Sequence, residues 1–260
     1  MEAAPVDLPG PPYRPPPEVP VLPHDEVHVW RAALDQDVFR IHALHRTLAA
    51  DELARAGNFH FDRDRERFIV ARGVLRVILG AYLNRPPESL SFRSGPQGKP
   101  ALAAGPEPDA IRFSVSHTHG TALYAVARGR EVGIDIERIR SDLAIVEIAE
   151  RFFSPREAAR LRALPAAGQP EAFFRYWTRM EAYIKALGGG LSIPLDRQDV
   201  AVAAGEPGAV AVTQPDAAGN SCWSVQELPA GPGHAAALAV AGQGWTLSCW
   251  QWPEQGLESG

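Results

Sequence analysis

The sequence contains very little cysteine. Cys222 and Cys249 are too few for a disulfide framework, and no Cys/His cluster has the spacing of zinc ligands. No apolar run approaches the roughly 20 residues that cross a bilayer, and the N-terminus lacks the basic-then-apolar order of a secretory signal. We therefore expect a soluble protein of the reducing cytoplasm, without a membrane partner.

The sequence also lacks an excess of basic residues. Its formal net charge of -5 gives no general positive field, so non-specific nucleic-acid binding is not indicated. The length of 260 residues is enough for one large domain or two small ones with a substantial core.

Proline is abundant before residue 24, as in Pro11-Pro12 and Pro15-Pro16-Pro17. Such a segment favours extended polyproline conformations and cannot form a helix. We interpret residues 1–23 as a mobile arm or, at most, an ordered strap. A PxxP ligand is an alternative reading, although such matches are common by chance.

The remaining chain alternates between short strand patterns and helix patterns, an order typical of the α+β class. Strand, helices and strands follow one another twice, over 24–126 and 127–252, before a tail at 253–260. Asp51 is a plausible helix N-cap, and residues 113–136 are interpreted as an antiparallel hairpin system with Ser116-His117 near one rim. The expected strands are 26–33, 90–93, 111–116, 122–126, 131–137, 200–202, 209–212, 222–227, 235–241 and 245–252, and the expected helices are 42–48, 50–55, 64–83, 144–153, 155–164 and 169–187.

The pattern at 169–187 predicts an amphipathic helix ended by three glycines. Its apolar stripe consists of Phe173, Trp177, Met180, Ile184 and Leu187. Glu181 and Lys185 are four residues apart, so they share one edge of that stripe. A solvated salt bridge between them is the plainer interpretation.

The strand at 131–137 carries two carboxylates. Asp135 and Glu137 alternate with Ile134 and Ile136, so the two acids point to one face and the isoleucines to the core. Adjacent carboxylates repel each other unless a cation or a proton intervenes. With Glu181 as a third oxygen ligand, the set suits Mg²⁺, although exposed strand carboxylates are far more common than metal ligands.

The helix expected at 64–83 has a cationic face. Five arginines decorate it: Arg63, Arg65, Arg67, Arg72 and Arg76. A solvated surface and an anion-binding site are equally good interpretations of this pattern.

These motifs together resemble the 4′-phosphopantetheinyl transferases, in particular their single-chain, surfactin-synthetase-activator-like type. The resemblance covers about residues 55–195, with the motifs in the order and spacing of that family. The matching segments are Gly98-Lys99-Pro100, Phe113-Ser114-Val115-Ser116-His117, Gly133-Ile134-Asp135-Ile136-Glu137, Arg151-Phe152-Phe153-Ser154, Trp177-Thr178 with Glu181-Ala182 and Lys185, and Gly190-Leu191-Ser192-Ile193-Pro194-Leu195. The family fold is a pseudo-twofold pair of α+β halves with the active site between them, in agreement with the duplicated pattern.

The resemblance implies transfer of phosphopantetheine from coenzyme A to a serine of an acyl, peptidyl or aryl carrier protein, with release of 3′,5′-ADP. It implies Mg²⁺, with Mn²⁺ as an alternative, held by Asp135, Glu137 and Glu181. Glu181 would also be the base, and Lys185 would stabilise charge on the moving phosphate. The residues that fall where the family contacts coenzyme A are Arg67, Gly98, Lys99, Pro100, Ser116, His117 and Lys185, with Arg55 added through a looser alignment.

One position departs from the family pattern. Met180 stands where the family usually has a lysine, so the site has one cation fewer near the phosphates. We expect Lys185, Lys99 and the arginine face to suffice and activity to survive. A non-catalytic module that binds coenzyme A or a carrier protein is the alternative, and a plain α+β interaction protein is a third reading. Two halves in one chain make a monomer sufficient.

Overall fold

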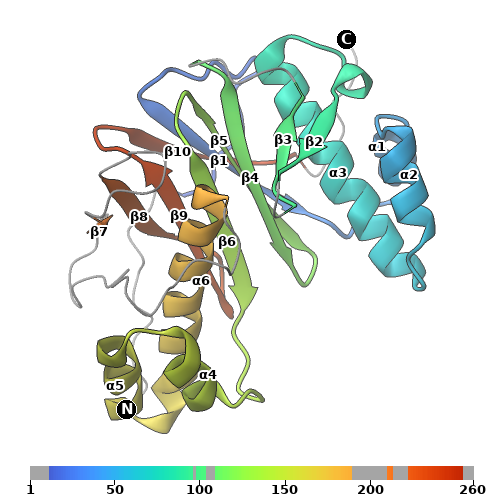
Figure 1. Ribbon diagram of the computed structural model, residues 1–260. Helices are drawn as coiled ribbons and strands as arrows, with labels where there is room; N and C mark the ends of the chain where they lie inside the picture. The colour runs from blue at the N-terminus through green and yellow to red at the C-terminus, as the bar shows by residue number, and fades with distance from the viewer. Residues whose placement is uncertain (1–11, 96–97, 104–108, 189–209, 213–221, 254–260) are drawn as a thin grey trace. The chain divides into compact units, whose positions relative to one another are not determined.

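The computed structural model describes residues 12–95, 98–103, 109–188, 210–212 and 222–253. The chain divides into two compact units. The β1 unit comprises Tyr13–Gly129 together with the segment from Trp245 onward, and the β6 unit comprises Arg130–Gly244. Both combine helices with mostly antiparallel strands, which confirms the α+β class (Figure 1).

The β1 unit is built on a four-stranded sheet in the order β10-β1-β5-β4. Its strands are β1 (Glu26–Ala33), β4 (Ile111–Thr118), β5 (Thr121–Arg128) and β10 (Thr246–Gln251), and a separate pair is formed by β2 (Phe92–Ser94) and β3 (Pro100–Leu102). The long helix α3 (Asp62–Leu83) packs on the sheet through Val70, Val74 and Ile78, which share one apolar core with Trp30 and Tyr124. The remaining helices of the unit are α1 (Val38–His45), α2 (Ala50–Gly57) and the 3-10 helix η1 (Pro87–Ser89).

The β6 unit has its own four-stranded sheet in the order β6-β9-β8-β7. The strands are β6 (Val132–Arg138), β7 (Val210–Val212), β8 (Trp223–Leu228) and β9 (His234–Ala241). Helix α6 (Gln169–Leu187) lies along one face of this sheet, as Figure 1 shows, and buries Ala182, Tyr183 and Ala186 against β8 and β9. The other helices are α4 (Ile145–Phe152), α5 (Pro155–Ala163) and the 3-10 helix η2 (Ala166–Gly168).

Local sequence signals located several elements well. The expected strand at 26–33 and helix at 169–187 have the bounds that the structure gives to β1 and α6. Ser154 caps α5, with Pro155 as its first residue and Glu157 completing the capping box. Gly188 ends α6 in a left-handed conformation.

Several expectations differ from the structure. The helix expected at 42–48 is α1, which begins earlier because Asp37 caps it, and the strand expected at 90–93 is β2 at Phe92–Ser94. Asp51 does not cap α2, because the helix already begins at Ala50 and the Glu52 carboxylate accepts a hydrogen bond from the N–H of Ala49, 3.0 Å away. The hairpin expected over 113–136 ends with β4 and β5, since β6 pairs with β9 in the other sheet. The strand at 245–252, expected in the half 127–252, instead pairs in parallel with β1. The strand expected at 200–202 lies outside the described residues.

The described part of the proline-rich segment is a strap on the sheet edge. The backbone of Arg14 bonds to both neighbours of Trp250, through Arg14 N–H to Cys249 C=O (3.1 Å) and Gln251 N–H to Arg14 C=O (2.7 Å). The Arg31 guanidinium lies 4.4 Å from the centre of the Tyr13 ring. These contacts pair two backbone groups on the outer edge of β10, at Cys249 and Gln251.

We predict that this strap stabilises the fold. A variant that starts at Pro15 loses both Arg14 hydrogen bonds and the Tyr13–Arg31 contact, at a cost of about 2 kcal/mol. Its melting temperature should therefore fall by about 4–8 °C. The control is a variant that starts at Pro12 and keeps these contacts. Equal melting temperatures for the two variants would contradict the prediction.

Candidate active site

The close packing of α6 on β6 forms the centre of the candidate site. A Cβ atom added to Gly133 would lie 2.0 Å from the carbonyl oxygen of Ala182 and 2.4 Å from the backbone nitrogen of Ala186. Only glycine therefore lets the helix backbone come this close to the strand. Residues two and four positions further along β6 share the face of Gly133, so Asp135 and Glu137 lie on the face that is turned toward the helix.

Lys185 and Asp135 form an ion pair across this packing. The ammonium Nζ of Lys185 lies 2.6 Å from Oδ1 of Asp135. The carboxylate is only 4% exposed and the lysine side chain 31% exposed. A buried carboxylate needs such a partner. The plainer interpretation was a solvated salt bridge between Lys185 and Glu181 on the same helix. The ion pair seen here is a different one, because Lys185 reaches Asp135 on β6.

Glu137 and Glu181 complete a concentration of negative charge. Burial, followed by the charge of Asp135, raises the pKa of the Glu181 carboxyl, and Lys185 partly opposes this. Burial and the charge of Asp135 also raise the pKa of Glu137, and the charge of Glu181 adds to the same effect. These mutual effects bring Asp135, Glu137, Glu181 and Lys185 into one electrostatic group within the β6 unit.

The donor set fits a hard divalent cation in its chemistry. Carboxylate oxygens are the ligands that Mg²⁺ prefers. Burial, and after it repulsion between the carboxylates, raises the pKa values of Glu137 and Glu181, and a cation would relieve that repulsion. Within the described ranges, however, no three acidic, histidine or cysteine side chains already converge in a ligand arrangement.

Glu227, which belongs to no sequence motif, ties α6 to β8. Glu227 on β8 accepts hydrogen bonds from Arg175 Nε at 3.1 and 3.0 Å, and it also pairs with Nη1 of Arg179. Arg179 is 4% exposed, and burial lowers the pKa of its guanidinium. Its position inside the helix motif was visible in the sequence, but a partner 48 residues away was not.

Met180 belongs to the core. Its side chain is 5% exposed and packs in one cluster with Phe153, Phe173 and Ile184. The apolar stripe expected for this helix is thus confirmed at this position. The missing lysine leaves a packed methionine and no defect in the helix.

The β1 unit holds the residues that the resemblance assigns to coenzyme A. Arg67 on α3 bonds to Asp35, and Gly120 at the tip of the β4–β5 hairpin adjoins this pair. Ser116 is buried and His117 exposed near the end of β4 on that hairpin. Gly98 and Lys99 lie in the β2–β3 turn, Pro100 begins β3, and Arg55 lies on α2 with its guanidinium 5.3 Å from the Phe68 ring centre.

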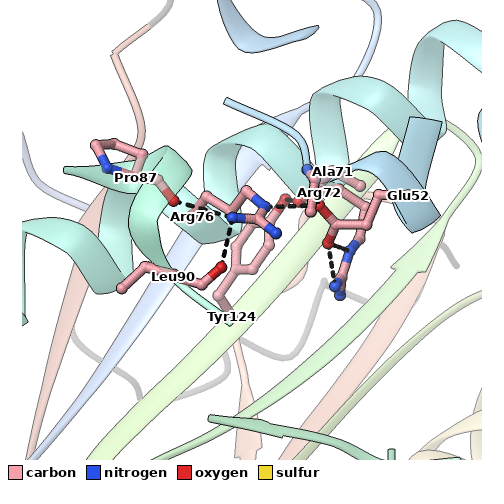
Figure 2. Close-up of polar contacts among 8 residues, drawn as sticks. Glu52, Ala71, Arg72, Arg76, Pro87, Leu90 and Tyr124 are labelled. Atoms are coloured by element: carbon pink, nitrogen blue, oxygen red, sulfur yellow. Dashed lines mark hydrogen bonds and ion pairs between the residues drawn. The ribbon is translucent and has the colours of Figure 1, made fainter. Parts of the chain in front are cut away.

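The arginine face of α3 is neither a bare solvated surface nor an undivided anion site. Arg76 is 1% exposed and donates to Glu52 (2.6 Å) and to the carbonyls of Pro87 and Leu90 (both 3.0 Å), while Arg72 binds the same glutamate (Figure 2). Arg65 pairs with Asp62 at 2.6 Å. Arg72 and Arg76 therefore join α2, α3 and η1. Arg63 and Arg67 both approach Asp35 beside the tip of the β4–β5 hairpin, and we keep them as the candidates for a ligand.

The motif at 190–195 lies outside the described residues.

No helix in the described ranges is both long and apolar enough to cross a membrane.

Comparisons with known proteins agree for both halves of the chain. A model of the 4′-phosphopantetheinyl transferase superfamily matches residues 131–241, and one of the 4′-phosphopantetheinyl transferase N-terminal region matches residues 30–128. The chain is 41% identical to the 4′-phosphopantetheinyl transferase HetI of Nostoc sp. over 91% of its own length and 96% of that relative. It is 30% identical to a 4′-phosphopantetheinyl transferase of Bacillus subtilis (65% and 72% covered) and 28% identical to Sfp of B. subtilis strain 168 (75% and 82% covered).

We predict that Gly133→Ala displaces α6 and disrupts the acidic group. The new methyl would overlap backbone atoms that cannot rotate away, so the free energy of unfolding should fall by about 3 kcal/mol or more. Urea unfolding measures this loss. The matched control is Gly57→Ala, where no atom lies within 4 Å of the added Cβ and the change should be neutral or stabilising by up to about 1 kcal/mol. Equal midpoints for Gly133→Ala and the parent protein would show that α6 is not held by this contact.

Proposed function

The chain belongs to the 4′-phosphopantetheinyl transferase superfamily, and we propose that it transfers phosphopantetheine from coenzyme A to a serine hydroxyl of an apo acyl, peptidyl or aryl carrier protein. The serine oxygen bonds to the phosphorus that carries pantetheine. The bond from that phosphorus to the bridging oxygen breaks, and its electron pair leaves on 3′,5′-ADP. The observation that carries the proposal is the group of Asp135, Glu137, Glu181 and Lys185 between α6 and β6.

Asp135, Glu137 and Glu181 would hold Mg²⁺. Three carboxylates beside one ammonium leave two negative charges, which a divalent cation balances. When bound, the metal neutralises pyrophosphate oxygens and so favours attack on phosphorus. Mn²⁺ has the same charge and preference for oxygen ligands and is the alternative.

Glu181 is the candidate base for the serine proton. It lies on α6, whose backbone is fixed against β6 at Gly133, and its side chain is only partly buried, as a base for an incoming hydroxyl must be. Removal of this carboxylate should slow transfer even when both substrates are bound.

Lys185 would stabilise negative charge on the moving phosphate or on the departing 3′,5′-ADP. Its pairing with the buried Asp135 holds the ammonium in one place, and its own partial exposure leaves it accessible to substrate. Arg67, Lys99, Ser116 and His117 would bind coenzyme A phosphates and adenosine, with Gly98, Pro100 and Arg55 supporting that set.

The decisive experiment is intact mass spectrometry of an apo carrier protein after incubation with this protein, coenzyme A and Mg²⁺. We expect the carrier to gain the mass of one phosphopantetheine. The gain should disappear with EDTA, and Glu181→Gln should slow it by about 100-fold or more, as for loss of a general base. Glu147→Gln, which removes an exposed carboxylate on α4, is the control. An unmodified carrier, across acyl, peptidyl and aryl types, would refute the proposed activity.

We further predict that Mg²⁺ stabilises the protein through the acidic group. Binding at ten times the dissociation constant adds about 1.4 kcal/mol to the free energy of unfolding, which corresponds to a rise of about 3–6 °C in melting temperature. The rise should vanish in Glu137→Gln and persist in Glu147→Gln. An equal rise in all three proteins would mean that Mg²⁺ binds elsewhere.

A further inference from the structure

We propose that Asp35 is a positioning residue that fixes the guanidinium of Arg67 for binding a phosphate of coenzyme A. This inference rests on the proposed function, because it takes Arg67 as a ligand of coenzyme A. It adds a residue that belongs to none of the sequence motifs described above.

The pair has the geometry that holds an arginine in a single orientation. Arg67 Nε lies 2.7 Å from Oδ1 of Asp35, and Nη2 lies 2.7 Å from Oδ2. Two parallel hydrogen bonds fix the plane of a guanidinium as well as its position. They occupy two of its five N–H groups, and the others point along different edges of the fork. The carboxylate is 58% exposed and the Arg67 side chain 18% exposed.

The chain around Asp35 is itself anchored to the hairpin tip. The N–H of Leu34 donates to the carbonyl of Gly120 over 2.7 Å, and the Leu34 side chain is buried. Asp35 therefore follows directly after a fixed residue at the end of β1. The backbone next to Asp35 is therefore held by a contact that does not involve Arg67.

Gly120 closes the other side of the pair. An added Cβ would lie 2.7 Å from Oδ2 of Asp35 and 2.9 Å from Nη2 of Arg67. His119 and Gly120 have φ values of 40° and 84° and join Thr118 to its partner Thr121, which is the geometry of a tight two-residue hairpin turn. The absence of a side chain at Gly120 lets the hairpin tip contact both charged groups.

This arrangement brings Arg67 to the hairpin that carries Ser116 and His117. His117 is exposed three residues before Gly120. The turn at His119-Gly120 therefore contacts the Arg67–Asp35 pair and also follows directly after β4, the strand that carries Ser116 and His117. Arg63 approaches Asp35 more loosely, at 3.8 Å, and remains largely exposed.

The sign of the effect distinguishes orientation from simple charge. A carboxylate next to an anion site repels the ligand, so if charge alone mattered, its removal would strengthen coenzyme A binding. If orientation matters, Arg67 without Asp35 samples several rotamers and loses this freedom when it binds coenzyme A, so binding becomes weaker. Because exposed ion pairs contribute little to folding stability, the variant should fold and report on the orientation.

The test is the steady-state kinetics of Asp35→Asn with a carrier protein that the parent enzyme modifies. We expect the KM for coenzyme A to rise about tenfold, while kcat and the KM for the carrier protein change little. Asp62→Asn is the matched control, since it breaks an exposed Asp–Arg pair on the same helix without touching Arg67. Thermal melting checks that both variants are folded.

A double-mutant cycle with Arg67→Ala shows whether Asp35 acts through Arg67. In the Arg67→Ala background, Asp35→Asn should not raise the KM for coenzyme A further. Additive effects, or a lowered KM in Asp35→Asn, would overturn the proposal while the proposed reaction stands. An unchanged KM in Arg67→Ala alone would overturn it too, and would also remove Arg67 from the coenzyme A site without affecting the mass-spectrometric test of the reaction.

Discussion

The contact between the α6 backbone and Gly133 of β6 is the constraint on which the candidate active site depends. No other residue type would allow a carbonyl oxygen to approach this closely. Because the helix lies directly on the strand at Gly133, Lys185 of α6 can reach the carboxylate of Asp135, two residues after Gly133 on β6. The Gly-x-Asp-x-Glu pattern thus has one packing residue and two charged ones. Their spacing of two keeps all three on one face of the strand.

Ion pairs between distant parts of the sequence hold the helices that carry the site. Arg175 and Arg179 bind Glu227 in the β6 unit, and Arg72 and Arg76 bind Glu52 in the β1 unit (Figure 2). In each case two arginines four residues apart on a helix share a single glutamate. A shared carboxylate keeps the buried arginine of each pair, Arg179 or Arg76, partnered, and it restricts rotation of the helix about its axis.

The sequence was informative wherever the signal was local. The capping box at Ser154, the period of α6 and the alternation of β1 depend on residues a few positions apart, and the structure agrees with each. Pairing between distant segments was not readable in this way. The neighbours of β6 and β10 are strands about 100 and 220 residues away in the chain, and no local pattern records such a choice.

The same limit explains which site residues were missed. Asp135, Glu137, Glu181 and Lys185 stand within short motifs, whereas Asp35 and Glu227 belong to none of them. Asp35 lies 32 residues from Arg67. A row of arginines in the sequence therefore shows the positive charge but not which guanidinium groups are buried among protein acceptors, as Arg76 is at 1% exposure, and which keep an exposed edge, as Arg67 does at 18%. In this protein that distinction separates structural arginines such as Arg76 from the candidate ligand Arg67.

The carboxylate group costs folding stability, and the apolar contacts of α6 help to offset that cost. Half-buried acids whose pKa values are raised destabilise the folded state at neutral pH, because the unfolded chain releases their protons more easily. On the same helix, Phe173 stacks on Trp177 with ring centres 5.7 Å apart and packs against Phe153 at 5.3 Å. Met180 fills the same cluster. A lysine at this position would have to extend its ammonium out of the core. The methionine brings no positive charge, but its packing adds to the stability of the helix and helps to offset the cost of the acidic group.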